Sequence, residues 1–379
     1  MAQKVVPMET KLRAVFAAGL KGVSVTSVCE DLEISRQTFY KYKRRFEAEG
    51  PAGLVERSRR PLSSPGLMAV GLEDEIVRLR KTLPLDNGAQ TIAYHLARTG
   101  GEVPPVRTIH RALVRRGMVV AQPEKRPRAS WRRFEWPRPN DAWQIDATRW
   151  ALRSGREVWV MDILDDHSRL SIAARVCDGP TGDAAWDAFC DGVSRHGTPA
   201  HVMSDNGTCF TGRFLSGGEA AFERDLRTLG VRHLLSSPAH PQTCGKLERW
   251  HQTLKKWLRA QPLARTHRDL QSQLDDFADF YNHDRPHRAL AGDTPSERWA
   301  ASQSATPGPP LPAVPNASLH TVQTNNLISW SRHRIAVGPG LAGTQLLVIA
   351  RGDNLAVFGP TGLIRRLSVD RSRNYQPRT

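Results

Sequence analysis

Apolar residues recur at helical spacing in three short segments near the start of the chain. The first, METKLRAVFAAGLKG, stops at Gly22, and the second, SVTSVCEDLE, follows Ser24 as its N-cap. The third, SRQTFYKYKRRFEAEG, has Ser35 as its N-cap and aromatic residues that can face inward: Phe39, Tyr42 and Phe46. Two short helices with a tight break between them predict a helix-turn-helix domain over residues 1–56. A small three-helix bundle that contacts no DNA would show the same periodicity.

The polar face of the third predicted helix is rich in side chains that contact bases and phosphates. We expect DNA contacts from Arg36, Gln37, Lys41 and Arg44.

Residues 57–120 repeat this pattern after a basic connector, ERSRRPLSSPG. Three amphipathic segments follow: LEDEIVRLRKTL, GAQTIAYHLARTG and PPVRTIHRALVRRG. They predict a second helix-turn-helix domain, in which Arg111 and Arg115 of the last helix contact DNA.

The segment 121–140 is basic and interrupted by prolines, and three aromatic residues are interleaved with its charges: Trp131, Phe134 and Trp136. This composition suits an extended linker that lies on nucleic acid, through phosphate pairing and stacking.

From residue 141 the pattern changes to strands and then to alternating helices and strands. Three consecutive strands are predicted in WQIDATRWAL, REVWVMDILDD and LSIAARVCD, followed by the helix TGDAAWDAFCDGVSRHG. Two further strands, AHVMS and VRHLLSS, lie either side of the helix EAAFERDLRTLG, and the last helix begins near CGKLERWHQTLKKWL. This order predicts a mixed α/β sheet covered by helices over residues 141–300. A Pro-rich linker over 301–315 leads to short strands, for which a small basic β-barrel over 316–379 is the simplest interpretation.

The charge of this multidomain chain is unevenly distributed. The net charge is +16 over 379 residues, with +12 in residues 1–140, −2 in 141–315 and +6 in 316–379. Basic flanks around a near-neutral middle suggest a polyanion that the flanks hold and the middle processes, although a solvated basic surface would look the same. The five cysteines show no paired spacing, which argues against a disulfide framework or a Cys-rich zinc module. With no long apolar run and no signal peptide, we expect a cytoplasmic protein that does not contact membranes.

Three acidic residues stand at positions where a carboxylate needs a partner. In WQIDATRW, strand alternation places Asp146 in mid-strand, where burying a lone carboxylate costs several kcal/mol. Asp205 follows a short apolar strand in VMSDNG, at the strand end where open α/β sheets place their sites, although Asp-Asn-Gly is also a common turn sequence. Glu248 lies on a predicted helix, where it shares a polar face with Gln252 and Lys255.

Carboxylate oxygens from two strands and one helix suit Mg²⁺ or Mn²⁺ rather than zinc. Bound cations would also offset the mutual repulsion of the three acids. Two ions about 4 Å apart could hold the attacking and leaving oxygens of a phosphodiester. A second acidic group in DILDDHSR, Asp162, Asp165, Asp166 and His167, lies between two predicted strands, and we interpret it as a hairpin turn with polar capping.

Four stretches together resemble the catalytic core of DDE transposases and retroviral-type integrases, particularly that of bacterial insertion-sequence transposases. They are WQIDATRW, VMSDNGTCFTGRF, SSPAHPQTCGKLERWHQTLKKWL and YNHDRPHRALAGDTPSERW. The resemblance covers residues 141–300 and, more loosely, the helix-turn-helix domains before them. It implies a ribonuclease H-like core with Asp146, Asp205 and Glu248 as the catalytic, metal-binding triad.

The same resemblance assigns further residues. Lys246, Gln252 and Lys255 would contact DNA, and the approach to the catalytic helix would contain His240, Pro241, Gln242 and Gly245. A motif after the core would be structural or close to DNA: Tyr281, Asn282, Arg285, Pro286 and His287. Two departures stand out, because 42 residues separate Asp205 from Glu248, more than is usual in the family, and the zinc-binding N-terminal module of retroviral integrases is absent.

The function that the resemblance implies is DNA transposition. The protein would bind the terminal inverted repeats of a mobile element, hydrolyse the phosphodiester at each end and join the 3′-hydroxyl to target DNA, as a homo-oligomer on double-stranded DNA in a bacterial cytoplasm or nucleoid. Two alternatives stay open: a DNA-binding regulator that kept the core for assembly only, and a metal-dependent nuclease that cuts without joining.

Overall fold

The computed structural model describes residues 6–17, 23–56, 68–119, 135–213, 218–236, 245–309 and 315–378. They divide into two compact units, residues 1–68 and 69–379. None of the described helices is both long and apolar enough to cross a bilayer.

The first unit consists of α1 (Met8–Ala17), α2 (Val25–Asp31), α3 (Arg36–Glu49) and a 3₁₀ turn, η1 (Gly50–Leu54). Both predicted caps are confirmed, because Ser24 accepts from the Ser27 amide and Ser35 accepts from the Thr38 amide, each at 3.1 Å. Its small core contains Ala14, Val28 and Phe39.

A buried lysine, Lys11, contacts three parts of this small unit. Lys11 is 3% exposed, and its Nζ donates to the Leu54 carbonyl at 3.2 Å and to Oε1 of Glu56 at 2.7 Å. The ammonium also lies 4.8 Å from the ring centre of Tyr42, whose hydroxyl donates to the same Glu56 oxygen. Hydrogen bonds from Lys11 and Tyr42 lower the pKa of Glu56 to about 2, so this carboxylate stays ionised and ties η1 to α1 and α3.

The second unit begins with three helices, α4 (Val70–Thr82), α5 (Ala89–Arg98) and α6 (Val106–Arg115), which confirms the second predicted helical group. Their apolar stripes meet through buried Ile76, Ile92 and Ile109. Ion pairs then join this group to residues of the core region: Asp86 accepts from Nε of Arg285 at 2.9 Å, and Arg98 pairs with Glu297.

A five-stranded mixed sheet, in the order β3-β2-β1-β4-β5, forms the centre of the second unit. Its strands β1 (Ala142–Ala151), β2 (Glu157–Asp165) and β3 (Ser171–Cys177) are antiparallel, whereas β4 (His201–Ser204) and β5 (Arg232–Leu235) run parallel to β1. The predicted mixed sheet is confirmed.

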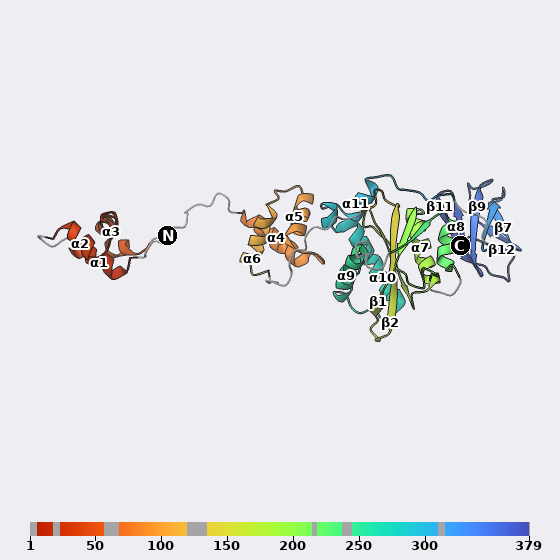
Figure 1. Cartoon of the computed structure of the whole chain (residues 1–379), viewed down its shortest axis with the longest axis horizontal. Helices are drawn as coiled ribbons and strands as arrows, with labels where there is room; N and C mark the ends of the chain where they lie inside the picture. Colours follow the sequence, from red (N-terminus) through yellow and green to blue (C-terminus); the bar gives the residue numbers. More distant parts are fainter. Residues whose placement is uncertain are drawn as a thin grey trace. The chain divides into compact units, whose positions relative to one another are not determined.

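Helices cover both faces of this sheet (Figure 1). One face packs on α7 (Gly182–His196) and α8 (Ala221–Thr228), and the other on α9 (Gly245–Arg259) and α10 (His267–Asp279). The approach of α7 is close at Gly192, where a Cβ would come 2.7 Å from Cγ2 of Ile172. A larger residue there would push α7 away from β3.

Two amide side chains close the outer edge of β3. Gln271 of α10 accepts from the Val176 amide at 2.9 Å and donates to the Ala174 carbonyl at 2.8 Å. Asn282, in the π-helical turn η2 (Phe280–Asp284), accepts from the Ser171 amide at 2.8 Å and donates to its carbonyl at 3.0 Å. These bonds take the place of a sixth strand, so this edge is protected from pairing with another chain. The core ends with η3 (Arg288–Leu290) and α11 (Pro295–Ala300).

The C-terminal region contains two small sheets that share one apolar core. The first has the order β11-β10-β9-β6, and the second β12-β8-β7. The described strands do not close into one continuous hydrogen-bonded cylinder, so the predicted barrel is not confirmed. These strands are β6 (Ala317–Thr321), β7 (Leu327–Trp330), β8 (His333–Ala336), β9 (Gln345–Arg351), β10 (Asn354–Gly359), β11 (Gly362–Ser368) and β12 (Tyr375–Gln376).

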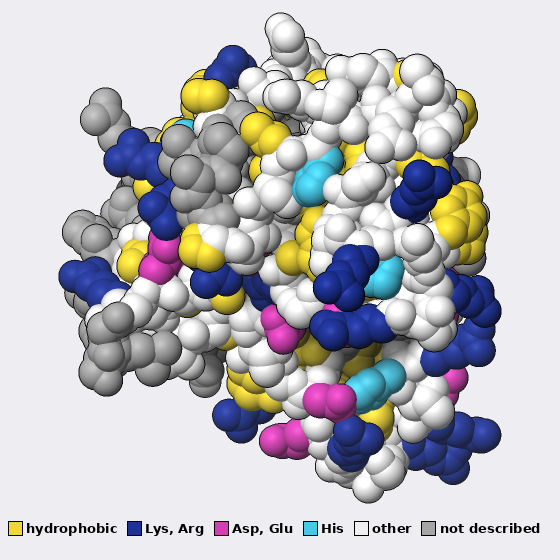
Figure 2. Space-filling model, turned by 90° about the vertical axis from the view of Figure 1, so that its right-hand side faces the viewer, with side chains coloured by type: hydrophobic (Ala, Val, Ile, Leu, Met, Phe, Trp, Pro, Cys, Tyr) yellow, Lys and Arg dark blue, Asp and Glu magenta, His cyan; other side chains and the backbone are white. Residues whose placement is uncertain are grey.

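On the face that Figure 2 shows, the positive charge does not form one basic surface. Figure 2 shows Lys and Arg side chains in several separate groups, with acidic side chains between them. Four arginines of the C-terminal region are paired with carboxylates: Arg351, Arg366, Arg371 and Arg373. Arg351 and Arg366 bind acids of α7 and α8, so they hold the C-terminal sheets on the core.

Candidate active site

Two of the three predicted carboxylates lie at one edge of the sheet, on neighbouring parallel strands. The ladder between β1 and β4 sets Trp143 opposite Val202 and Gln144 opposite Met203. The same offset, continued by two residues, brings Asp146 opposite Asp205. Both side chains line one small cavity, together with Leu247 at the start of α9.

Asp205 has the turn role that its sequence suggests. Its Oδ1 accepts from the Gly207 amide at 2.9 Å, and a Cβ on residue 207 would come 2.9 Å from that oxygen. Glycine therefore permits the close turn, while the carboxylate stays exposed at the strand end. The turn and a role in binding a ligand are compatible, since Oδ2 has no hydrogen-bond partner among the described residues.

Glu248 is exposed on the first turn of α9. Its charge reaches Asp146: burial raises the pKa of Asp146, the charges of Asp205 and Glu248 raise it further, and the Ala147 amide and His251 act in the opposite direction. The Ala147 amide donates to Oδ1 of Asp146 at 2.7 Å. Three acids thus influence one another at this edge of the sheet.

The donor set fits a hard divalent cation. None of the described Lys or Arg side chains forms an ion pair with Asp146, Asp205 or Glu248, and the described partner of Asp146 is His251, whose Nδ1 lies 4.0 Å from its Oδ2. Carboxylate oxygens are the ligands that Mg²⁺ and Mn²⁺ prefer. In their present positions, however, no three His, Cys, Asp or Glu side chains of the described segments converge as a complete metal site.

The interpretation of Asp162 as a turn residue is wrong. Asp162 lies within β2, directly opposite Asp146 of β1, and is fully buried. Its Oδ2 accepts from Nε2 of His251, in α9, at 2.7 Å, and burial raises the pKa of Asp162 to about 6 although His251 lowers it. Burial alone would lower the pKa of His251, but the charges of Asp162 and Asp146 raise it overall.

Among the other members of the DILDDHSR group, Asp165 caps the turn between β2 and β3, whereas Asp166 and His167 contact β1 and the segment before it. Asp165 accepts from the Ser168 amide and hydroxyl at 2.8 and 2.7 Å. Asp166 accepts from Nε2 of Gln144 at 2.7 Å, and Nδ1 of His167 lies 2.8 Å from the Trp136 carbonyl.

The residues expected to bind DNA differ in their exposure and in whether they already form an ion pair. On α3, Arg36, Gln37, Lys41 and Arg44 are exposed on one face together with Tyr40, which the sequence analysis overlooked. The sequence did offer a signal for Tyr40, because an aromatic residue among the basic residues of a helix face can stack on a base. In the structure Tyr40 is half-exposed.

On α6 the two predicted residues are in different environments. Arg111 is exposed and has no ion pair among the described residues. Arg115 donates to Oε2 of Glu73 at 2.9 Å, and its neighbour Arg116 pairs with the same carboxylate.

Three predicted DNA contacts lie on α9. Lys246 is mostly buried, and its Nζ lies 2.5 Å from Oδ2 of Asp166, so its charge is already used. Burial lowers the pKa of Lys246 even beside that carboxylate. Gln252 is exposed and accepts from Arg249, and Lys255 is half-buried.

Several predicted residues lie outside the described segments: Trp131, Phe134, His240, Pro241 and Gln242. Gly245 is the first residue of α9. The motif after the core is structural in its described contacts. Tyr281 is buried, Asn282 closes the β3 edge, and Arg285 pairs with Asp86 and stacks on Tyr281.

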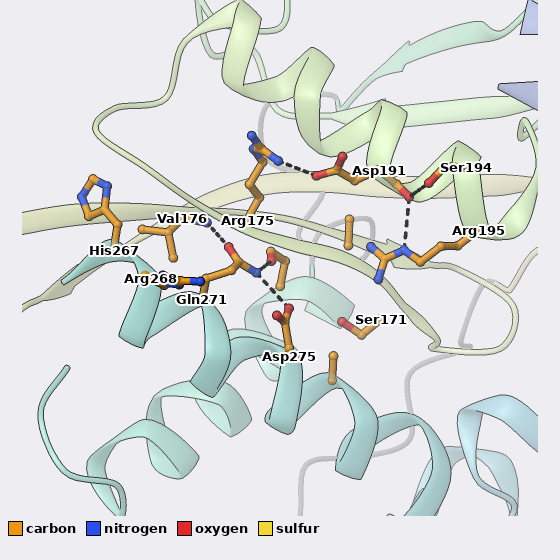
Figure 3. Close-up of a pocket in the computed structure, with 13 residues that line it drawn as sticks. Ser171, Arg175, Val176, Asp191, Ser194, Arg195, His267, Arg268, Gln271 and Asp275 are labelled. Atoms are coloured by element: carbon orange, nitrogen blue, oxygen red, sulfur yellow. Dashed lines mark hydrogen bonds and ion pairs between the residues drawn. The ribbon is translucent and has the colours of Figure 1, made fainter. Parts of the chain in front are cut away.

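A groove of about 560 Å³ lies on the other side of the core, between β3, α7 and α10 (Figure 3). Two of its polar side chains already have partners: Nη1 of Arg175 lies 2.7 Å from Oδ2 of Asp191, and Gln271 points to the Val176 backbone and to Asp275.

Comparison with known families agrees with this architecture. Residues 137–241 and 229–295 match two models described as integrase core domains. Residues 10–61 match a helix-turn-helix domain, and residues 38–113 match a homeodomain-like domain.

Similar proteins include two encoded by insertion elements. The uncharacterized 39.2 kDa protein of IS476 from Xanthomonas euvesicatoria is 26% identical over 43% of this chain and 45% of its own length. The uncharacterized 31.7 kDa protein of IS407 from Burkholderia multivorans is 27% identical over 45% and 59%. The chain thus spans about half the length of these curated relatives. The HTLV-2 integrase catalytic core, solved with magnesium, is 20% identical over 42% of this chain and 97% of its own, with a TM-score of 0.33.

Proposed function

We propose that the chain is an insertion-sequence transposase of the DDE type, which binds the ends of a mobile DNA element, cuts a phosphodiester at each end and joins the 3′-hydroxyl to target DNA. The observation that carries this proposal is the meeting of Asp146 and Asp205 at the β1–β4 edge, within electrostatic reach of Glu248.

In this proposal Asp146, Asp205 and Glu248 hold Mg²⁺ or Mn²⁺, as two ions. Such ions, when bound, polarise the phosphodiester and stabilise the charge that develops on its oxygens. The protein holds two of these carboxylates in place by backbone hydrogen bonds. The Ala147 amide donates to Asp146, and the Gly207 amide donates to Asp205. The position of Glu248 is set by α9, which packs through the buried side chains of Leu247, Trp250 and Leu254.

The DNA-binding residues are proposed to lie on three helices. The face of α3 would read the element ends through Arg36, Gln37, Tyr40, Lys41 and Arg44. On α6 Arg111 would contribute directly, whereas Arg115 would have to leave Glu73 first. On α9 Gln252 and Lys255 would approach the DNA beside Glu248, and the buried pair with Asp166 argues for a structural role of Lys246.

The wider organisation is proposed on the same grounds. The two DNA-binding domains would comprise residues 1–56 and 57–120, and the catalytic core residues 141–300. The linkers would be residues 121–140 and 301–315, and a small barrel-like domain would comprise residues 316–379. Two DNA ends must be processed together, which favours a homo-oligomer on double-stranded DNA.

A strand-transfer assay tests this function. Native protein, Glu248→Gln and the control Glu157→Gln, an exposed acid at the far end of the β1–β2 hairpin, are incubated with labelled element-end DNA and Mg²⁺. We expect joined product from the native protein and the control only. Cleavage without joining would indicate a nuclease. End binding by all three proteins without any reaction would indicate a DNA-binding regulator.

A further inference from the structure

Asp162 is a buried acid that the proposed reaction does not use. It has no exposed surface, and its Oδ1 has no hydrogen-bond partner among the described residues. Leaving a carboxylate half-satisfied inside a sheet is costly, and an apolar residue of similar size would pack there at lower cost. The only described hydrogen bond to its carboxylate, at 2.7 Å, comes from Nε2 of His251.

His251 connects this buried acid to the candidate active site. Its other ring nitrogen, Nδ1, lies 4.0 Å from Oδ2 of Asp146, which stands directly across the ladder from Asp162. His251 follows Glu248 by three residues, so the two side chains lie on neighbouring positions of one helix surface. The His251 imidazole therefore lies between Asp162 and Asp146, and it is one helical turn from Glu248.

We propose, on the basis of the function above, that Asp162 and His251 form a positioning pair, which fixes the rotation of α9 on the sheet so that Glu248 stands beside Asp146 and Asp205 as a metal ligand. The apolar face of α9 alone does not require this bond, because Leu247, Trp250 and Leu254 are already almost fully buried. What a hydrogen bond adds to such packing is a defined direction.

Metal binding by the full-length protein tests the pair without relying on activity. Mn²⁺ affinity is measured by electron paramagnetic resonance for the native protein, His251→Ala and His251→Gln. Groups that orient metal ligands typically change metal affinity ten- to hundredfold when removed, and we expect a loss of about that size in His251→Ala. His251→Gln should retain most of the affinity, since the glutamine amide can donate from a position close to that of the imidazole Nε2.

Asn282→Leu is the matched control. It removes two buried hydrogen bonds to Ser171 at the outer edge of β3, so we expect a lower Tm with unchanged Mn²⁺ affinity. DNA binding should be the same in all four proteins.

Equal Mn²⁺ affinity in His251→Ala and the native protein would overturn the inference, as would a glutamine variant as weak as the alanine variant. Native protein that holds no Mn²⁺ would overturn both the metal assignment and the pair. If the native protein binds Mn²⁺ and the variants follow the expected order but no DNA is cut or joined, the proposed function fails while the positioning pair stands.

Discussion

Nε of Arg351, in β9, donates to Oδ2 of Asp225, in α8, at 2.6 Å. Asp225 has no exposed surface, and Arg351 also pairs with Asp183 and lies over the ring of Trp186, 5.0 Å from its centre. The C-terminal sheets and the core also share one apolar cluster at this contact. The basic residues at the end of the chain therefore have a structural use as well as any role toward DNA.

Replacing Arg351 by methionine should destabilise the second unit strongly. Removing one member of a buried ion pair leaves an uncompensated charge and typically costs about 3–5 kcal/mol. Urea unfolding followed by tryptophan fluorescence measures this loss. The matched control is Arg371→Met, whose partner Asp353 is exposed, and here we expect little or no loss of stability. Equal losses in both variants would contradict a structural role for the buried pair.

Asp165 should make stability depend on pH. Burial raises its pKa to about 6, against hydrogen bonds from Ser168 and Asn140 that lower it. The folded state therefore holds a proton that the unfolded state releases near pH 4. The stabilisation is complete below that pH and is lost as the pH rises through about 6, by roughly 2–3 kcal/mol in total.

The difference in unfolding free energy between the native protein and Asp165→Asn isolates this effect. We expect the native advantage to be larger at pH 4 than at pH 7. A difference that does not change with pH would show that Asp165 keeps the same protonation in both states.

The α3 surface allows a sharp test of DNA recognition. Arg44 is exposed beside Gln37, Tyr40 and Lys41, whereas the charge of the adjacent Lys43 already has a partner, Glu47, at 3.8 Å. Arg44→Ala should weaken binding to element-end DNA and reduce the dependence of log Kd on log salt by about one, as expected for one lost phosphate contact. Lys43→Ala, of equal charge change, should alter both far less. Anisotropy titrations at several salt concentrations would detect the difference, and equal effects would contradict a particular role of Arg44 in DNA binding.

Local signals explain how much of the fold the sequence could predict. The caps at Ser24 and Ser35 and the alternation in β1 depend on residues within a few positions, so the elements and their order followed from them. Asp146 and Asp205 were recognisable for the same reason, since each stands at a specific place on its own strand. Whether they act as ligands is a question that the strand-transfer assay answers.

Long-range partners account for what the sequence could not predict. His251 lies 89 residues from Asp162, and without the register of β1 and β2 the acid resembles part of a turn. Lys246 looks like a free charge at the start of a helix, but its partner, Asp166, is 80 residues away. Closure of the C-terminal sheets into a barrel likewise depends on pairing between distant strands, which short alternating runs do not specify.

The proposed DNA-binding helix α6 offers the last test, because two arginines one turn apart on it differ in their partners. Arg111 of α6 is exposed and unpaired among the described residues, whereas Arg115 is paired with Glu73, itself 15% exposed. Arg111→Ala should therefore weaken binding to element ends, with the salt slope reduced by about one, and leave Tm unchanged.

Arg115→Ala should change DNA binding less and lower the stability of the α4–α6 group slightly, as for a partly exposed ion pair. The two variants are compared by anisotropy and by thermal unfolding. A larger loss of DNA affinity in Arg115→Ala would mean that Arg115 leaves Glu73 when DNA binds, and that Arg116, which pairs with the same carboxylate, is then the residue that keeps α4 and α6 together.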